Sequence, residues 1–235
     1  MQPVKSAKRK RRYEDPQAAI KAIARAQMAE NGTAALSLRA IAAQMGMSAP
    51  SLYNYYPDRD ALITALIVDA FNALADALIA ARDRHADAHA VDKLIAVLMA
   101  YRGWAVDNPT EFQLIYGTPI PHYHAPREVT VPVVVRGFAV IIGLVEELLH
   151  SDRFTPCPPY DVIPETTRAS LEAMIARDGY HVTPMAVYLG IVGWTQLHGL
   201  IALEAYHHLQ PVVGDTQAHY QAQMLNMLRS FGIRL

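Results

Sequence analysis

A tight turn at Gly46 between two short segments constrains this chain more than any other feature. Residues 37–59 read SLRAIAAQMGMSAPSLYNYYPDR. Ser37 and Ser48 are placed to cap two successive helices, because a serine hydroxyl can accept a hydrogen bond from a first-turn amide. Gly46 falls where a helix ends in the left-handed conformation that glycine adopts without strain. The stretch therefore predicts a short helix, a turn and a second short helix that Pro57 stops.

Apolar spacing predicts which faces of these helices pack inward. Leu52 and Tyr56 of the second helix point toward a core, while Ser51 and Tyr55 point elsewhere. The inward residues of the first helix share one face: Leu38, Ile41, Ala42 and Met45. An earlier helix, starting at Asp15-Pro16, completes a three-helix unit.

A short rigid helix with outward polar side chains fits the major groove of DNA, while its partner helix braces against the backbone. We expect the outward residues of the second helix to contact phosphates or base edges: Ala49, Ser51, Tyr53, Asn54 and Tyr55. Helix N-termini at Ser37 and Ser48 offer amide groups to phosphate, and Arg39 and Arg59 add charge nearby. A unit used only for packing is the alternative interpretation.

The same residues resemble a known family. The segment from Ile23 to Leu62, above all S-L-x-x-I-A-x-x-M-G-M-S-x-x-S-L-Y-x-Y-Y-x-x-R-x-x-L, resembles the N-terminal domain of the tetracycline-repressor (TetR) family of bacterial transcriptional regulators. The resemblance implies that Ser37 and Arg39 contact DNA from the first helix and that Arg59 opens the fourth helix as a cationic contact. It places four residues on the recognition helix: Ala49, Ser51, Tyr53 and Tyr55. The sequence departs from that family at Pro50 and Tyr55, where Gly and His are frequent, which leaves the operator sequence open.

Charge is distributed unevenly along the 235 residues. Net charge is −1, but residues 1–60 hold ten Lys/Arg against five Asp/Glu, so the remainder is acidic. Residues 1–13 form a basic arm that we expect to be disordered without a ligand. Its basic residues can enter the adjacent minor groove or add salt-sensitive, sequence-independent affinity, and a solvated tail without a partner is the third interpretation: Lys8, Arg9, Lys10, Arg11 and Arg12.

Helical spacing continues to the C-terminus, and no segment alternates as a strand would. The sequence therefore predicts an all-α protein with a disordered arm (1–13), a helix-turn-helix DNA-binding domain (14–60) and a larger helical domain (61–235). The resemblance to the TetR family implies that this larger domain binds a ligand and carries the dimer interface. Helices are expected near 89–107, 109–116, 128–150, 165–177, 184–208 and 215–231.

Two further motifs resemble the C-terminal part of TetR-family regulators: N-P-x-x-F-x-L-I-Y at 108–116 and W-x-x-x-H-G-L-x-x-L-E at 194–204, a Trp-His-Gly pattern of one branch of its ligand-binding domains. We predict a homodimer through the 184–208 and 215–231 helices, because Gly190, Gly193 and Gly199 permit close backbone approach. The final helix would add an apolar stripe: Tyr220, Met224, Leu225 and Leu228. Aromatic and polar residues on facing helices are candidates for an effector pocket, with ordinary core packing as the alternative: Tyr101, Trp104, Phe112, Tyr116, Trp194 and His198.

Other classes of protein fit the sequence less well. Cys157 is the only cysteine, so no internal disulfide forms, which is typical of a reducing cytosol. Interrupted apolar stretches at 129–145 and 185–203 favour buried or interface helices over membrane spans. No His or Cys spacing indicates a metal site, no cofactor motif is present and no catalytic motif appears.

The sequence therefore predicts a cytoplasmic, nucleoid-associated homodimer that binds a palindromic DNA operator and is released by a small hydrophobic effector. Two alternatives remain open: an effector-independent DNA-organising protein, and an enzyme that uses the apolar cavity.

Overall fold

The computed structural model describes residues 13–235, and within that range the regular structure is helical, with no strand. The predicted all-α class is confirmed. The chain forms two compact units. The N-terminal unit contains the described residues up to Ala70 together with Thr110–Val131, and the C-terminal unit contains Phe71–Pro109 and Pro132–Leu235.

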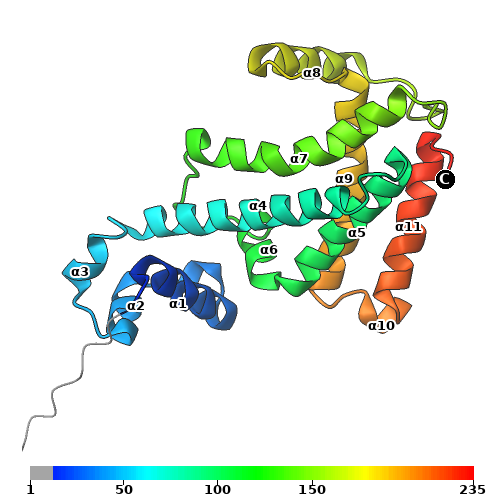
Figure 1. The fold of residues 1–235 in the computed structure, drawn as a ribbon. Helices are drawn as coiled ribbons and strands as arrows, with labels where there is room; N and C mark the ends of the chain where they lie inside the picture. Colours follow the sequence, from blue (N-terminus) through cyan, green and yellow to red (C-terminus); the bar gives the residue numbers. More distant parts are fainter. Residues whose placement is uncertain (1–12) are drawn as a thin grey trace, which may run out of the picture. The chain divides into compact units, whose positions relative to one another are not determined.

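The N-terminal unit contains the short helices expected around the turn (Figure 1). Its helices are α1 (Pro16–Asn31), η1 (Thr33–Ala35), α2 (Leu38–Met45), α3 (Ala49–Tyr53), the first half of α4 (Arg59–Asp83) and α6 (Pro109–Tyr116). Asp15 Oδ1 accepts a hydrogen bond from Ala18 N at 3.0 Å, and Asp58 Oδ1 accepts one from Ala61 N at 2.7 Å. These aspartates start α1 and α4 by satisfying first-turn amides that lack helical partners.

Ion pairs hold α1 to two other helices of this unit. Lys21 Nζ lies 2.8 Å and Arg25 Nη2 3.0 Å from Asp69 Oδ2 on α4. Arg25 Nε also lies 3.2 Å from Glu111 Oε1 on α6. The bridging Arg25 therefore keeps α6 attached to the helices that carry the turn.

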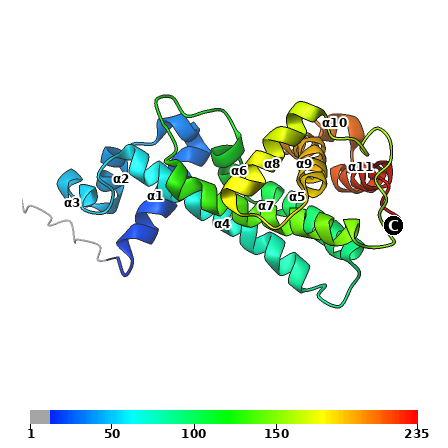
Figure 2. The same ribbon diagram turned by 90° about the horizontal axis from the view of Figure 1, so that it is seen from above.

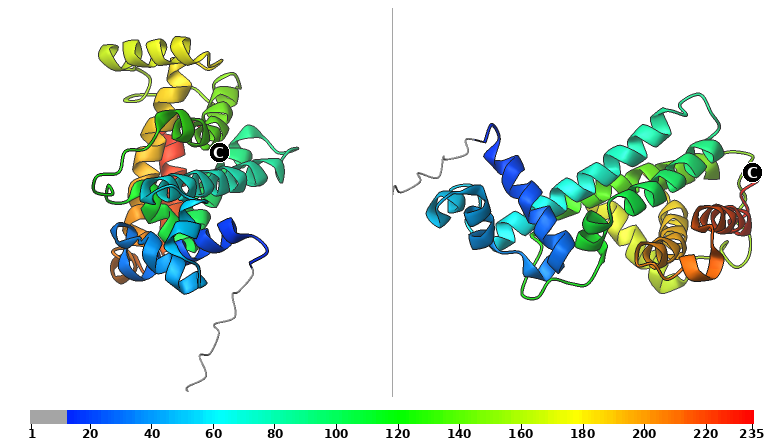
Figure 3. Two further views of the ribbon diagram at one scale, coloured as in Figure 1. Left: turned by 90° about the vertical axis from the view of Figure 1, so that its left-hand side faces the viewer. Right: turned by 90° about the horizontal axis from the view of Figure 1, so that it is seen from below.

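The C-terminal unit is built around α9, which packs against α5, α8 and α11 (Figures 2 and 3). Its helices are the second half of α4, α5 (Ala90–Asp107), most of α7 (Arg127–Leu149), α8 (Glu165–Asp178), α9 (Pro184–Ala205), α10 (Gln210–Val213) and α11 (Thr216–Phe231). Thr183 Oγ1 caps α9 by accepting from Ala186 N, and Asp215 caps α11.

The prediction that one helix runs to His208 was wrong by three residues. α9 ends at Ala205, and His207 has a positive φ of 60°. This left-handed residue turns the chain into α10, which periodicity did not predict because it spans a single turn. A helix cannot continue through such a residue.

Candidate functional site

The turn between α2 and α3 has the geometry that the sequence predicts. Gly46 has a φ of 68°, and its N–H is directed at the carbonyls of Ala42 and Ala43 at the end of α2. Ser48 Oγ then accepts a hydrogen bond from Ser51 N at 3.3 Å and starts α3. Both helix ends are thus satisfied within the turn, which fixes the angle between the two helices.

The two sides of α3 differ in burial as predicted. Leu52 is 1% exposed and Tyr56 is 6% exposed, and burial raises the pKa of the Tyr56 hydroxyl. Tyr53 is 43% exposed, whereas Ser51 and Tyr55 are half-buried. The inward side chains therefore anchor the helix and leave a tyrosine-bearing flank facing solvent.

α3 is shorter than expected. It ends at Tyr53, and Tyr55 lies in the turn that follows, where its N–H donates to the Leu52 carbonyl at 2.9 Å. The prediction that Pro57 ends the helix was wrong by several residues: the N–H groups of Tyr55 and Tyr56 both donate to the Leu52 carbonyl, which closes the last turn before the proline. Ala49, half-buried, is the first residue of α3, and the Ser51 hydroxyl lies 2.7 Å from the Ser48 hydroxyl.

The start of α2 presents a second group of candidate DNA contacts. Ser37 Oγ caps the helix by accepting from Ala40 N at 3.3 Å, and the Arg39 side chain is exposed. Arg59 is half-buried, and its guanidinium donates to two backbone carbonyls, those of Ala34 and Leu36. The basic residues expected to accompany them lie outside the described residues: Lys8, Arg9, Lys10, Arg11 and Arg12.

Three of the six candidate effector residues meet in the C-terminal unit. Trp194 Nε1 donates to the Tyr101 hydroxyl at 3.1 Å, and that hydroxyl lies 2.7 Å from His198 Nδ1. Burial lowers the pKa of His198, which favours the neutral imidazole, and a neutral Nδ1 can accept the Tyr101 proton. The Trp-x-x-x-His spacing on α9 and one tyrosine on α5 therefore form a connected polar group in apolar surroundings.

The remaining candidates lie elsewhere. Trp104 is buried on α5. Phe112 and Tyr116 belong to the N-terminal unit, where their ring centroids lie 5.5 Å apart. Phe112 is 1% exposed, so it is a core residue of that unit.

An apolar cavity of about 20 Å³ lies among α5, α7, α9 and α11. Tyr101 and Trp194 border it, together with residues that the sequence did not single out, among them Leu98, Ile141, Leu197 and Phe231. Helical periodicity identified these positions as apolar but carried no signal for which of them border a void. A volume of this size accommodates about one water molecule.

The glycines of α9 have separate roles. A Cβ on Gly190 would lie 3.1 Å from Ile142, and one on Gly193 would lie 3.4 Å from Phe231, so both glycines serve packing inside the unit. Gly199 is exposed, and a Cβ there would meet no atom within 4 Å. Only Gly199 of the three is therefore open to another chain.

The apolar stripe expected at a dimer interface on α11 packs inward instead. Tyr220, Met224 and Leu228 are at most 2% exposed within the chain. Leu225 is half-buried. The assignment of Tyr220, Met224 and Leu228 to a partner was wrong, because the spacing that marks an apolar stripe does not say whether it contacts its own chain or a second one.

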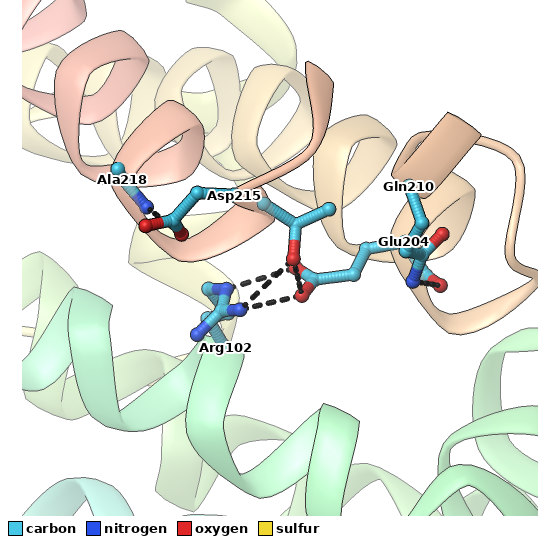
Figure 4. A network of polar contacts seen from close by, with 6 residues as sticks. Arg102, Glu204, Gln210, Asp215 and Ala218 are labelled. Atoms are coloured by element: carbon cyan, nitrogen blue, oxygen red, sulfur yellow. Dashed lines mark hydrogen bonds and ion pairs between the residues drawn. The ribbon is translucent and has the colours of Figure 1, made fainter. Parts of the chain in front are cut away.

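A buried ion pair joins α5 to α9 and was not foreseen (Figure 4). Arg102 Nε donates to Glu204 Oε2 at 2.8 Å, and the Arg102 and Glu204 side chains are 10% and 5% exposed. Thr216 Oγ1 donates to Glu204 Oε1 at 2.6 Å, which brings the start of α11 into the network. Glu204 is the last residue of the Trp-His-Gly motif, so that motif carries both the polar group at Trp194 and this pair.

Comparison with known proteins identifies the family. The pattern described as "Bacterial regulatory proteins, tetR family" matches residues 20–66, and "Tetracyclin repressor-like, C-terminal domain" matches residues 94–227. The HTH-type transcriptional regulator Rv1816 of Mycobacterium tuberculosis is 35% identical over 201 residues, which cover 85% of this chain and 84% of the relative. The chain belongs to the TetR family of transcriptional regulators.

Solved structures agree with this assignment. The crystal structure of SCO4313, a protein assigned as regulatory, has a TM-score of 0.73 at 32% identity and covers 91% of this chain and 95% of its own. A bacterial regulatory protein of the tetR family from Rhodococcus RHA1 has a TM-score of 0.64 at 19% identity, covering 93% of this chain and 98% of its own, which shows the shared fold. A second relative, the HTH-type regulator Mb1846 of Mycobacterium bovis, is also 35% identical over 201 residues, with the same coverage of 85% and 84%.

As a TetR-family regulator the protein binds DNA and dimerises, and its relatives are regulators of transcription rather than enzymes. As a transcriptional regulator of this family, the protein is cytoplasmic.

By length and composition alone, α4, α7 and α9 are apolar enough to cross a membrane. Within residues 13–235, no cluster of three or more His, Cys, Asp or Glu side chains is arranged to hold a metal ion.

Proposed function

We propose that this TetR-family protein is a homodimeric repressor that binds a roughly palindromic operator and is released by a small hydrophobic effector. The observation that carries the proposal is the division of α3 into a buried flank and an exposed flank. Leu52 in α3 and Tyr56 in the turn directly after it anchor the helix, and Tyr53 projects into solvent. A helix held in this way can enter a major groove without losing its packing.

The proposed DNA contacts lie on α2, on α3 and on the turn after α3. Tyrosine and serine hydroxyls on this surface can donate to phosphates or to base edges, and the first turns of α2 and α3 offer backbone amides. The contacts proposed on the described residues are Ser37, Arg39, Ala49, Ser51, Tyr53 and Tyr55. The basic cluster from Lys8 to Arg12 would add salt-sensitive affinity.

The outward face of α9 is the proposed dimer interface. α9 carries no charged residue from Pro184 to Leu203, and Ile191, Gly199 and Leu203 on its outward side are exposed. An uncharged helix that exposes apolar side chains to water is stabilised when a second apolar surface covers them. A second copy crossing at Gly199 would supply that cover, and α11 would contribute its outward side rather than its buried stripe.

The cavity beside Tyr101 and Trp194 is the proposed effector site. Its lining residues carry no formal charge, which favours an uncharged apolar effector. Because the cavity measures about 20 Å³ and ligand pockets usually exceed roughly 300 Å³, an effector must displace lining side chains as it enters. Gly190 and Gly193 of α9 border this cavity, so the displacement acts on the helix whose other side faces the proposed partner.

Such an effector releases DNA only if it binds more tightly to a dimer whose two helix-turn-helix domains are wrongly spaced for the operator. A ligand with equal affinity for both arrangements would shift nothing. The effector would gain this difference in affinity from the cavity that it enlarges on α9.

The test is a selection of bound sequences from random double-stranded DNA by the full chain, with and without uncharged apolar probes such as indole and octanol. We expect an inverted repeat whose half-sites lie about one helical turn apart, and weaker binding when a probe is present. Tyr55→Ala should weaken operator binding while leaving the helical circular-dichroism spectrum unchanged, and Tyr206→Ala, which changes a tyrosine of the C-terminal unit, is the matched control. An unselective pool would instead support a DNA-organising protein, and unchanged operator affinity in Tyr55→Ala would remove that residue from the interface.

A further inference from the structure

The guanidinium of Arg59, the first residue of α4, is hydrogen-bonded to two backbone carbonyls of its own chain. Its Nε donates to the Leu36 carbonyl at 3.2 Å, and its Nη2 donates to the Ala34 carbonyl at 3.0 Å. Resemblance to the TetR family assigns this position to a cation that contacts DNA. The observed bonds give the guanidinium a different task.

The two carbonyls belong to the segment that leads into α2. Ala34 lies in the single turn of η1, and Leu36, which is 5% exposed, directly precedes the capping residue Ser37. Carbonyl groups at the end of a helical turn lack helical partners and need other donors. Arg59 supplies two such donors from one planar group.

The start of α2 is also held from α1. Ser37 N donates to Gln27 Oε1 at 3.3 Å, while Ser37 Oγ accepts from Ala40 N. The segment 34–37 is therefore fixed by α1 on one side and by α4 on the other. Its orientation decides where the first-turn amides of α2 and the exposed Arg39 point.

We propose that Arg59 is a positioning residue: it fixes the first turn of α2 for DNA and does not itself neutralise a phosphate. The planar guanidinium suits this role because its Nε and Nη2 can donate to two carbonyls at once. A lysine at this position would keep the charge but would present a single ammonium group. This inference rests on the proposed function for the operator that it uses.

The test compares Arg59→Lys and Arg59→Gln with Arg39→Lys and Arg39→Gln. The affinity of each full-length variant for the selected operator is measured between 50 and 200 mM salt, salt concentrations over which phosphate contacts become visible. Arg59→Lys should weaken operator binding about tenfold, as expected when one to two hydrogen bonds are lost. Its salt slope and its affinity for random DNA should match those of the wild type.

Arg39 is the matched cation on the same surface. Arg39→Gln should lower the salt slope by about 0.9, the contribution of one phosphate contact, and Arg39→Lys should restore it. Arg59→Gln should leave the slope unchanged. Wild-type affinity in Arg59→Lys, or a slope reduced in Arg59→Gln as it is in Arg39→Gln, would overturn the proposal.

Hydrogen exchange on the free protein provides a readout that needs no operator. In Arg59→Lys the first-turn amides of α2 should exchange at least tenfold faster than in the wild type, while those of α5 and α9 should be unchanged. Equal exchange in α2 would refute the positioning role, whatever DNA binding shows. Failure of the wild type to select any sequence, with faster exchange in the variant, would reject the proposed operator and leave the positioning role intact.

Discussion

Replacing Glu204 by leucine tests how much the buried Arg102–Glu204 pair between α5 and α9 contributes to stability. Glu204→Leu would leave the Arg102 guanidinium, whose side chain is 10% exposed, without its anion. It would also remove the acceptor of the Thr216 hydroxyl. Removing one partner of a buried pair costs about 3–5 kcal/mol, mostly because the other charge stays buried.

The magnitude follows from the size of the protein. For a chain of 150–250 residues, about 1 kcal/mol shifts Tm by roughly 2–4 °C, so we expect Glu204→Leu to lower Tm by about 10 °C. The double variant Arg102→Met/Glu204→Leu removes both charges and replaces them with apolar side chains of similar length. It should recover most of that loss, because a well-packed apolar pair often matches a buried ion pair.

The assay is calorimetry or urea unfolding of both variants at one protein concentration, since the Tm of a dimer depends on concentration. The exposed pair Arg82 and Asp83 provides the control, and Arg82→Met should leave Tm almost unchanged. A loss below about 1 kcal/mol in Glu204→Leu would show that water reaches the site. A double variant as unstable as Glu204→Leu would show that packing, rather than uncompensated charge, causes the loss.

Two further predictions concern α9. Gly199→Leu should shift the protein toward monomer in sedimentation while its circular-dichroism spectrum stays helical, because a side chain there meets nothing within 4 Å in its own chain. Gly103→Leu, at a similarly open position of α5, is the control. An unchanged dimer in Gly199→Leu would place the interface elsewhere. Burial lowers the pKa of His198 from its ordinary 6.5. As the pH falls below 6.5, the unfolded chain therefore binds more protons at this site than the folded chain does. The free energy of unfolding should therefore be retained above pH 6.5 and fall as the pH drops toward the pKa of folded His198. His198→Gln should flatten this dependence in unfolding measured from pH 7 to pH 5. A pH dependence identical to that of the wild type would indicate that other histidines cause it.

Local interactions explain why much of the DNA-binding part could be predicted. The caps at Asp15, Ser37 and Ser48 join residues three apart, and the left-handed turn at Gly46 needs only the absence of a side chain. Leu52 and Tyr56 are buried on the same side because they lie four residues apart and the Tyr56 N–H donates to the Leu52 carbonyl at 3.2 Å, as in one helical turn. Signals of this kind lie within a few residues of one another, so the sequence displays them directly.

The candidate effector group was only partly predictable. The Trp-x-x-x-His spacing placed Trp194 and His198 on one side of α9, but their shared partner Tyr101 is more than ninety residues distant. Phe112 and Tyr116 looked equivalent by composition and proved to pack in the other unit. An aromatic residue identifies a buried position without identifying its neighbours.

By itself the sequence determined the helices, their caps, the turn at Gly46 and the inward flank of α3, because each depends on residues close together in the chain. Only the tertiary structure decided the pairing of Arg102 with Glu204, the use of Arg59 as a donor to backbone carbonyls, and which glycine of α9 faces outward. α9 lacks charge along most of its length, so no polar face marks its orientation, and only the helices packed around it fix which side is left for a partner.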